Sequence, residues 1–520
     1  MLVNDWFVRL AAPSLLFLGL LVASGCNRQA AAPPAPFEIP VVRAQHGVVS
    51  FELTAVVDPS TGAPAFAYAG TVGSAPTIRL RPGDEIRVKL TNHLPSGTDA
   101  PNLINLHFHG LEVSPYPPSD DAMRLAAPGE SLDYDVHVSR EQPPGLYWYH
   151  SHAHGQTYWQ ITSGMSGAIV VEGLQQHLPA LAAMRERIIM LRNVQTPPDY
   201  DGIPIAARPE PNRSKIIAAR KRAGRFTLVD SDDSVGQPCA STPGLGVTMN
   251  GAPRRTIGID PGEWQLFRVV NASAGRYFDL QVDGEQLTLV ALDGFPLDAF
   301  AGSPPVQFLS HIVVAPAGRA EFLVRGLSHP TVMRSRCYVS GEAGDRDPEV
   351  VLADLRTDGG APPGAMSSPD LRRARPLPRS PRAARLPAIA ATRHIIFTED
   401  VDGFYINGRK FHMGDPPSVV AHAGTVERWV LINKTDEVHD FHIHQVHFAV
   451  ESIDGRATRP LHWVDTVTVP PMRYTHTAGT PGAAIVLMDF RNPAIRGTFV
   501  YHCHILDHED GGMMASIRVI

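Results

Sequence analysis

Three segments of the chain share one pattern of apolar and polar positions. They read RPGDEIRVKLTN (residues 81–92), DPGEWQLFRVVN (residues 260–271) and HAGTVERWVLIN (residues 422–433). In each segment a glycine is followed nine residues later by an asparagine, and the positions five and seven after the glycine are apolar. Alternation with a period of two is typical of a β-strand with one buried face. The pattern therefore predicts, in each segment, a strand that follows a glycine turn.

The spacing of the three copies predicts one architecture used three times. The copies begin at residues 81, 260 and 422, which is too far apart for the units of a solenoid but suits a β-sandwich domain. The predicted fold class is all-β, with three sandwich domains over residues 37–173, 187–355 and 393–520. Residues 358–388 are rich in proline, arginine and alanine, and we predict that they form an exposed linker.

The composition is that of a folded globular chain. Of the 520 residues, 43% are hydrophobic and 19% are charged, which argues against a largely disordered chain. The formal net charge is −6, so the charge balance gives no support to a nucleic-acid partner. The 44 glycines and 47 prolines are scattered along the chain, which favours many turns between short strands over a helical bundle.

The first residues are predicted to be an export signal. Residues 1–26 contain the apolar run LLFLGLLV, too short to span a bilayer. The run is followed by ASGC, which resembles a bacterial lipobox, so Cys26 is either lipidated or lost with an ordinary cleaved signal. Residues 27–36 are a predicted tether. The expected location is the periplasm or cell envelope, with a membrane anchor if Cys26 carries lipid. Export would make Cys239 and Cys337 candidates for a disulfide.

Ten of the 23 histidines fall in four short clusters. These read HFHG (residues 107–110), WYHSH (148–152), HDFHIH (439–444) and HCHILDHEDGGMM (502–514). The two histidines of an H-x-H pair lie on the same face of a strand, so two such strands side by side would form a pocket of several imidazoles. A single pair is more often structural, but four pairs in one chain predict a metal site.

The ligand types in these clusters favour copper over zinc. Zinc sites have three or four ligands, often with cysteine pairs or a carboxylate, and these clusters contain ten histidines and one cysteine. His439, Cys503, His508 and Met513 supply two imidazoles, a thiolate and a thioether, which is the ligand set of a blue-copper site. Eight further histidines suit copper held in a cluster: His107, His109, His150, His152, His442, His444, His502 and His504.

The four clusters resemble the signature motifs of the multicopper oxidases, the family of laccases, bilirubin oxidases and bacterial copper-resistance oxidases. HCHILDHEDGGMM is the most specific of the four. The resemblance implies three cupredoxin-like Greek-key sandwiches with copper motifs in the first and the last, in agreement with the three strand repeats. It also implies four copper ions per chain, one of type 1, one of type 2 and two of type 3.

The resemblance gives each ligand a role. The implied type 1 ligands are His439, Cys503, His508 and Met513. The other three coppers would be held by His107 and His442 (type 2), by His109, His150 and His504 (one type 3), and by His152, His444 and His502 (the other type 3). Because His502 and His504 flank Cys503, strand alternation points them away from the thiolate. Oxidation at the type 1 site would thus be connected to dioxygen reduction at the cluster between the first and third domains.

Several residues near the motifs need separate treatment. Asp440 stands where the family usually has proline, but it replaces no ligand. His154 and His447 lie outside the ligand pattern and are expected to support ligands or to face solvent. Because the reduction of dioxygen to water consumes four protons, carboxylates are expected near the cluster. Glu509 matches the family's acidic proton donor and Asp120 is a second candidate; the alternative for Glu509 is a solvated charge on a loop.

The expected function is that of a copper oxidase with dioxygen as electron acceptor and a small molecule or metal ion as reductant. Laccase-like oxidation of phenols or aromatic amines is the first hypothesis. The alternatives are oxidation of Cu(I), Fe(II) or Mn(II) in metal tolerance, and a non-enzymatic cupredoxin protein of the cell envelope. The 13 methionines form no methionine-rich insert, which counts against the cuprous type. Asp436 and Glu437 are expected in an exposed turn, or alternatively as a metal-ion dock. No oligomeric state is predicted.

Overall fold

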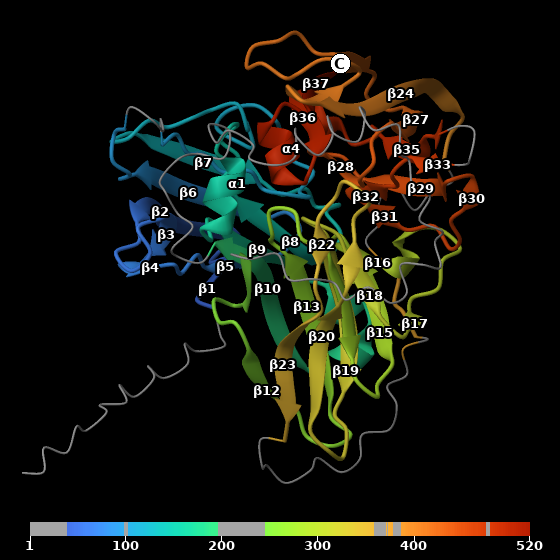
Figure 1. Cartoon of the computed structure of the whole chain (residues 1–520). Coiled ribbons are helices and arrows are strands. Elements are labelled where there is room, and N and C mark those ends of the chain that lie inside the picture. Colours follow the sequence, from blue (N-terminus) through green and yellow to red (C-terminus); the bar gives the residue numbers. More distant parts are fainter. Residues whose placement is uncertain are drawn as a thin grey trace, which may run out of the picture. The chain divides into compact units, whose positions relative to one another are not determined.

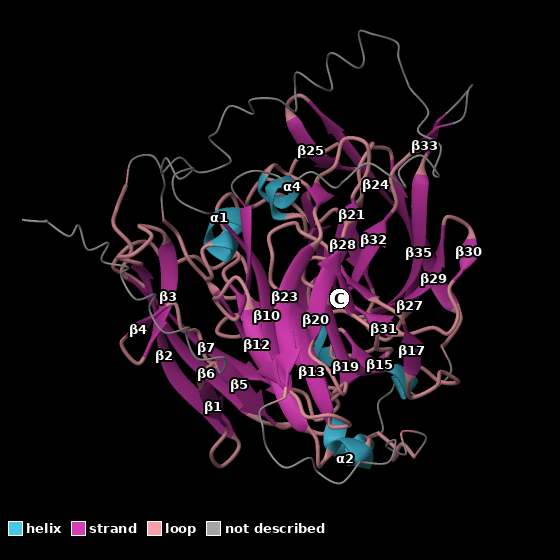
Figure 2. Ribbon diagram, turned by 60° about the horizontal axis from the view of Figure 1, so that its bottom comes forward, coloured by secondary structure: helices cyan, strands magenta, loops and turns pink. Residues whose placement is uncertain are grey.

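Strands make up most of the regular structure (Figures 1 and 2). The computed structural model describes residues 39–97, 102–195, 245–357, 371, 373–377, 386–474 and 479–520. The predicted signal, its Cys26, the tether, Cys239 and parts of the predicted linker lie outside these residues. In the part of the chain that the structure describes, no helix is long and apolar enough to cross a membrane. The prediction of an all-β chain with three sandwiches is confirmed.

The first sandwich encloses a core between sheets of order β1-β5-β9-β8 and β4-β3-β2-β6-β7. Strand β6 contains the first copy of the repeated pattern, and its alternate residues Ile86, Val88 and Leu90 share this core with Ile78 of β5. The strands are β1 (Val41–Arg43), β2 (Val48–Val57), β3 (Pro64–Tyr68), β4 (Thr71–Val72), β5 (Thr77–Leu80), β6 (Glu85–Asn92), β7 (Ser131–His137), β8 (Gly145–His150) and β9 (Ser166–Val171), followed by α2 (Leu174–His177) and η1 (Pro179–Leu181).

The second sandwich pairs the sheet β11-β10-β13-β19-β15-β16, in which β17 also joins β15, with the sheet β12-β23-β20-β14-β18. Phe267 and Val269 of β13 lie in its core. The elements are β10 (Arg185–Gln195), β11 (Leu245–Met249), β12 (Arg255–Gly258), β13 (Trp264–Asn271), β14 (Phe278–Val282), β15 (Leu287–Leu292), β16 (Phe295–Pro296), η3 (Leu297–Ala299), β17 (Gln307–Leu309), β18 (Ile312–Val314), β19 (Arg319–Arg325), β20 (Thr331–Arg336), β21 (Tyr338–Val339), β22 (Arg346–Asp347) and β23 (Val350–Arg356).

The third sandwich repeats this order, with the sheet β25-β24-β27-β35-β29-β30, in which β31 joins β29, packed on β26-β37-β36-β28-β32. Trp429 and Leu431 of β27 lie in its core. The elements are β24 (Ile389–Asp400), β25 (Gly403–Ile406), β26 (Val419–Ala421), β27 (Val426–Asn433), β28 (His439–Ile443), β29 (Phe448–Ile453), β30 (Arg456–Ala457), β31 (Trp463–Val464), β32 (Thr466–Val469), β33 (Arg473–Tyr474), β34 (Gly479–Thr480), β35 (Gly482–Asp489), η5 (Pro493–Ile495), β36 (Gly497–Cys503), α4 (Leu506–Asp510) and β37 (Met514–Val519).

The asparagine that ends each repeated strand has the same role in all three sandwiches. Asn92, Asn271 and Asn433 are fully buried, and the amide of each donates to two backbone carbonyls from later in its own sandwich. The amide oxygen of each accepts the N–H of the residue two positions further on. A turn residue that bonds its own backbone two residues on is a common use of asparagine. The side chain therefore fixes the end of the strand to the following loops.

Two short helices join the first sandwich to the third. Helix α1 (Thr157–Thr162) lies beside α4 (Figure 1). The Asp510 carboxylate at the end of α4 accepts the N–H groups of Gly155 and Tyr158 at 2.8 and 2.9 Å, and that of Thr157 at 3.3 Å. These donors at the start of α1 have no partner within their own helix, so the carboxylate supplies one. This contact lies beside the histidine motifs of both sandwiches.

We predict that Asn271→Asp lowers the free energy of unfolding by roughly 1–3 kcal/mol or more, because the two carbonyls that accept from the amide would face a carboxyl group in a buried place. Thermal unfolding followed by calorimetry measures the loss. Asn407→Asp is the matched control: Asn407 is exposed, its oxygen accepts the Ile396 N–H at 2.8 Å, which a carboxylate can also do, and its amide makes only one long, exposed hydrogen bond of 3.4 Å to the His394 oxygen. Equal losses from the two substitutions would contradict the role assigned to Asn271.

Candidate metal centres

The register of the strands brings the histidine motifs together in pairs. His107 and His150 exchange backbone hydrogen bonds of 2.9 and 3.1 Å across an isolated bridge. In the third sandwich, β28 pairs with β36 so that His442 lies opposite His502. Side chains directly opposite each other on neighbouring strands are in contact distance. Each pair of motifs therefore presents its imidazoles to the same region.

All eight histidines predicted for the cluster are buried and gather in this one region. The Nε2 atom of His502 lies 3.2 Å from Nε2 of His152 and 3.3 Å from Nε2 of His444. The rings of His107 and His444 stack with centroids 3.6 Å apart, and those of His109 and His442 stack at 3.9 Å. Eight buried imidazoles from two sandwiches thus face one another.

The ring nitrogens of this group fit a bound metal. Nδ1 of His107 lies 3.0 Å from the Asp120 carboxylate, and Nδ1 of His150 and of His442 lie 2.9 and 2.8 Å from the backbone oxygens of Ser151 and Asp465. The Nε2 atom of each of these three rings is buried and has no hydrogen-bond partner in the described part of the chain. One nitrogen anchored and the other left open is the pattern of histidines that bind metal.

Burial also sets the protonation of four rings in the group of eight. It lowers the pKa of His109, His444 and His504 well below the usual range, and the neighbouring imidazoles lower it further. Burial lowers the pKa of His502 to about 3. These four imidazoles are therefore neutral near pH 7, which is the form that binds a metal ion.

A second group forms around Cys503. The Sγ atom lies 3.7 Å from Nδ1 of His439 and 3.7 Å from Nδ1 of His508, and these two nitrogens are 3.0 Å apart. Thr435 Oγ1 lies 2.9 Å from the Nε2 atom of His439. Burial raises the pKa of the Cys503 thiol well above its usual range, so a bound cation is the partner that would stabilise a thiolate here.

Met513 adjoins this second group and Met514 faces elsewhere. The backbone oxygen of Met513 accepts the Cys503 N–H at 3.1 Å, and its side chain lies in the same core as Cys503. Met514 is the first residue of β37 and packs in a different cluster with Phe411 and Val500. Two imidazoles, a thiol and a neighbouring thioether make up a blue-copper ligand set.

Both predicted carboxylates contact the histidine cluster. Glu509 is buried, and its Oε2 lies 3.2 Å from Nδ1 of His502 while its Oε1 accepts a hydrogen bond from Thr157 at 3.1 Å. Burial and then the nearby Asp510 raise the pKa of Glu509 well above its usual range. The alternative of a solvated charge is therefore wrong for Glu509. Asp120, also buried, contacts His107 and accepts the Gln445 side-chain amide at 2.7 Å.

Two expectations about neighbouring residues need adjustment. The exposed turn predicted for Asp436 and Glu437 is wrong for Glu437, which is buried with its carboxylate 3.3 Å from Nε2 of His508. His447 is fully buried, so it does not face solvent. Asp440 is buried too, and burial raises its pKa well above the usual range.

Two charged residues that lie near the histidine cluster were not predicted from the sequence. Asp465 lies 3.4 Å from Nε2 of His109 and 3.5 Å from Nε2 of His447, and Arg319 binds Asp465. The only available signal was a single carboxylate inside the apolar run HWVDTVTV (residues 462–469). A charge in an otherwise buried strand is rarely left without a partner.

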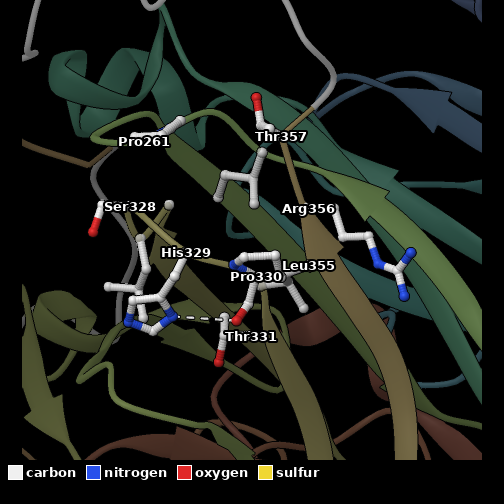
Figure 3. Close-up of a pocket in the computed structure, with 11 residues that line it drawn as sticks. Pro261, Ser328, His329, Pro330, Thr331, Leu355, Arg356 and Thr357 are labelled. Atoms are coloured by element: carbon white, nitrogen blue, oxygen red, sulfur yellow. Dashed lines mark hydrogen bonds between the residues drawn. The ribbon is translucent and has the colours of Figure 1, made fainter.

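A surface pocket of the second sandwich does not bring metal-binding side chains together. It lies where β19 and β23 end and β20 begins, and its lining contains one histidine, His329, next to Pro330, Thr331 and Arg356 (Figure 3). The Nδ1 atom of His329 lies 3.2 Å from the Pro330 oxygen. None of the twelve predicted ligands lines this pocket.

Comparisons with known sequences place this geometry in one family. Three family models, each described as multicopper oxidase, match residues 54–176, 223–326 and 380–520. The chain is 24% identical over 457 residues to a multicopper oxidase of Staphylococcus aureus, covering 85% of this chain and 81% of that one. It is 24% identical over 493 residues to a laccase of Bacillus subtilis (strain 168), covering 85% and 88%.

Solved structures show the same fold. A multicopper oxidase from Campylobacter jejuni, described as a metallo-oxidase, superimposes with a TM-score of 0.67 at 21% identity, covering 92% of this chain and 94% of that chain. A laccase-like multicopper oxidase from Ochrobactrum sp. gives a TM-score of 0.68 at 22% identity, covering 93% and 100%. At these identities the likeness establishes the cupredoxin-like fold of the sandwiches and no more.

We predict that Met513→Leu raises the reduction potential of a copper ion held by His439, Cys503 and His508, because a weakly binding thioether would be removed and Cu(I) favours fewer ligands. The substitution conserves volume and should cost less than about 1.5 kcal/mol of stability. A redox titration followed through the blue absorption measures the potential. Met514→Leu is the matched control and should leave it unchanged. A shift with Met514→Leu alone would mean that the ligand is displaced by one residue.

Proposed function

This chain belongs to the multicopper oxidase family, and we propose that it acts as a laccase-like oxidase. It would take single electrons from a phenol or an aromatic amine at a type 1 site and use them to reduce dioxygen to water at a trinuclear cluster. The observation that carries the proposal is the position of Cys503. Its thiol lies 3.7 Å from two imidazoles, while the adjacent His502 and His504 belong to the buried group of eight.

The proposed copper sites divide the ligands as follows. His439, Cys503, His508 and Met513 would hold the type 1 copper, and His107 and His442 the type 2 copper. His109, His150 and His504 would hold one type 3 copper, and His152, His444 and His502 the other. The Nε2 contacts of His502 with His152 and His444, at 3.2 and 3.3 Å, support the last group. Bound copper would supply the one-electron chemistry and the reduction of dioxygen.

The protein's own part in the reaction is to orient ligands and to supply protons. Cys503 and its backbone join the two sites through His502 and His504. Glu509 would hold a proton on its carboxyl group, 3.2 Å from Nδ1 of His502, and release it as dioxygen is reduced. Asp120 would fix the ring of His107 through Nδ1 and stands as the second proposed proton donor.

The choice of phenols or aromatic amines rests on the relatives. One is a laccase, and the Ochrobactrum protein is described as acting on lignin model compounds and lignosulfonate. Metal-ion oxidation is a second candidate, favoured by the buried Glu437 carboxylate against His508 and by Asp436 beside it, which accepts a hydrogen bond from the Tyr474 hydroxyl. Oxygen uptake with phenols, aromatic amines, Cu(I), Fe(II) and Mn(II) distinguishes the two.

We also propose that residues 1–26 direct export to the periplasm or cell envelope, with a lipid anchor if Cys26 is modified. The proposed domains remain residues 37–173, 187–355 and 393–520. Cys337 is disulfide-bonded, which accords with an oxidising compartment, whereas its candidate partner Cys239 lies outside the described residues.

We predict four coppers per fully loaded chain and loss of the blue colour in Cys503→Ser, because the thiolate that donates charge to the copper is gone. The trinuclear histidines of this variant should keep their copper. Metal analysis and visible absorption measure both quantities. One copper per wild-type chain, or mostly zinc, would contradict the proposed function.

We predict that Glu509→Gln slows oxygen reduction by roughly 100-fold or more, the usual range for a positioned acid, since glutamine keeps the shape but carries no ionisable proton. Copper content and blue colour should be intact. Oxygen uptake at saturating reductant measures the rate. The control is Glu141→Gln, the same substitution at an exposed carboxylate, which should leave the rate unchanged. A normal rate in Glu509→Gln would remove Glu509 from the proton path.

A further inference from the structure

A buried ion pair links the second sandwich to the histidine cluster. The guanidinium of Arg319, at the start of β19, donates from Nη1 and Nη2 to the two carboxylate oxygens of Asp465 at 2.7 and 2.6 Å. Both side chains are fully buried. Asp465 lies in the third sandwich, between β31 and β32. Bidentate pairing of this kind fixes the orientation of the carboxylate as well as its charge.

The Asp465 side of this pair touches two ligands of the proposed cluster. Its Oδ1 lies 3.4 Å from Nε2 of His109, and its backbone oxygen lies 2.8 Å from Nδ1 of His442. The rings of His109 and His442 stack on each other at 3.9 Å. A change in the orientation of Asp465 would therefore change the position of one ligand of the proposed type 3 pair and of one ligand of the proposed type 2 copper.

The Arg319 side is fixed by its own sandwich and by strand β8 of the first sandwich. Its Nη1 donates to the Ala317 oxygen at 3.1 Å, and its Nε to the oxygen of Leu146 on β8 at 3.3 Å. The Asp293 carboxylate accepts the Arg319 N–H at 2.8 Å and also the Asp465 N–H at 3.3 Å. The guanidinium is thus held on several sides, so it can serve as a fixed support for Asp465.

The first sandwich leaves room for this contact through a glycine in the first histidine motif. Gly110 follows His109 with φ of +84°, and a Cβ atom there would stand 2.5 Å from Nη2 of Arg319 and 2.7 Å from Oδ2 of Asp465. Those separations are too short for real atoms. The close approach of the ion pair to the motif therefore requires glycine at this position.

We propose that Arg319 is a positioning residue for the trinuclear site: acting through Asp465, it sets the orientation of His109 and His442. The inference rests on the proposed function, since it presumes that these histidines bind copper. The second sandwich contributes none of the eight predicted histidines, and Arg319 gives it a direct part in holding them. Partners of metal-binding histidines commonly alter metal affinity by about 10–100-fold when they are removed.

The test compares Arg319→Leu, Arg319→Lys and Asp465→Asn with the wild type, all as full-length copper-loaded protein. Each protein is titrated with a copper chelator while bound copper is counted. The blue absorption reports the Cys503 copper and electron paramagnetic resonance the type 2 copper, and the type 3 pair, which is silent in that measurement, is obtained by difference from the total bound copper. We expect Arg319→Leu and Asp465→Asn to lose trinuclear copper at about 10–100-fold lower chelator concentration, with the blue band unchanged. Arg319→Lys keeps the positive charge but lacks the planar guanidinium that makes the bidentate pair. Its loss of trinuclear copper should therefore be intermediate between those of the wild type and Arg319→Leu.

Arg268→Leu is the matched control. Arg268 is equally buried and forms an ion pair with Glu321, which accepts the N–H of the same Leu146, but it contacts none of the clustered histidines. It should lower stability without altering trinuclear copper. Equal copper loss in Arg268→Leu and Arg319→Leu, or none in any Arg319 variant, would overturn the inference. If Arg319→Leu does not fold, Arg319→Lys and Asp465→Asn decide it. A wild type without trinuclear copper would instead overturn the proposed function, and the inference with it.

Discussion

The structure depends on one constraint: a group of buried imidazoles has to stay neutral and each ring has to keep a fixed orientation. Burial lowers the pKa values of His109 and His504, so protonation of these rings does not compete with a metal. Neutral rings would still rotate unless one nitrogen of each were held. The holding atoms come from separate places: Asp120 and Ser151 in the first sandwich, and Asp465, Thr435 and Glu437 in the third. No single sandwich supplies all of them, so the site requires the assembled chain.

The strands and histidine pairs that could be predicted from the sequence are those that depend on short-range periodicity. A glycine, two alternating apolar residues and an asparagine were enough to find β6, β13 and β27, because each strand carries its own turn and its own buried amide. The H-x-H spacing found the imidazoles for the same reason, since alternation alone puts them on one face. The third and fourth motifs then converge through strand pairing, as between His442 and His502. Their convergence was inferred from family resemblance, whereas the registers that produce it are seen only in the structure.

The parts that sequence could not predict are contacts between residues far apart in the chain. Nothing near Glu437 indicates that its carboxylate will meet His508, so an exposed turn was the simpler interpretation. His447 sits three residues after a ligand, yet it is buried because Glu112 of the first sandwich lies 3.0 Å from its Nδ1. Arg319 and Asp465 have ordinary neighbours in sequence, and their pairing depends on how three sandwiches meet. Charge partners of this kind carry no local periodicity, so only the assembled fold reveals them.

The Arg319–Asp465 pair bears on why a sandwich without predicted ligands belongs to this site. Replacing a buried ion pair by apolar residues of similar size is often neutral or even stabilising, so folding stability alone is a weak reason for the pair. The orientation of the Asp465 carboxylate is a better reason for the pair. An apolar contact has no preferred angle, whereas a bidentate pair fixes the plane of the carboxylate. The carboxylate that Arg319 of the second sandwich orients in this way contacts His109, and Gly110 beside His109 leaves the space that the ion pair needs. The middle of the chain would then act as a frame that sets the angles of ligands supplied by the two ends.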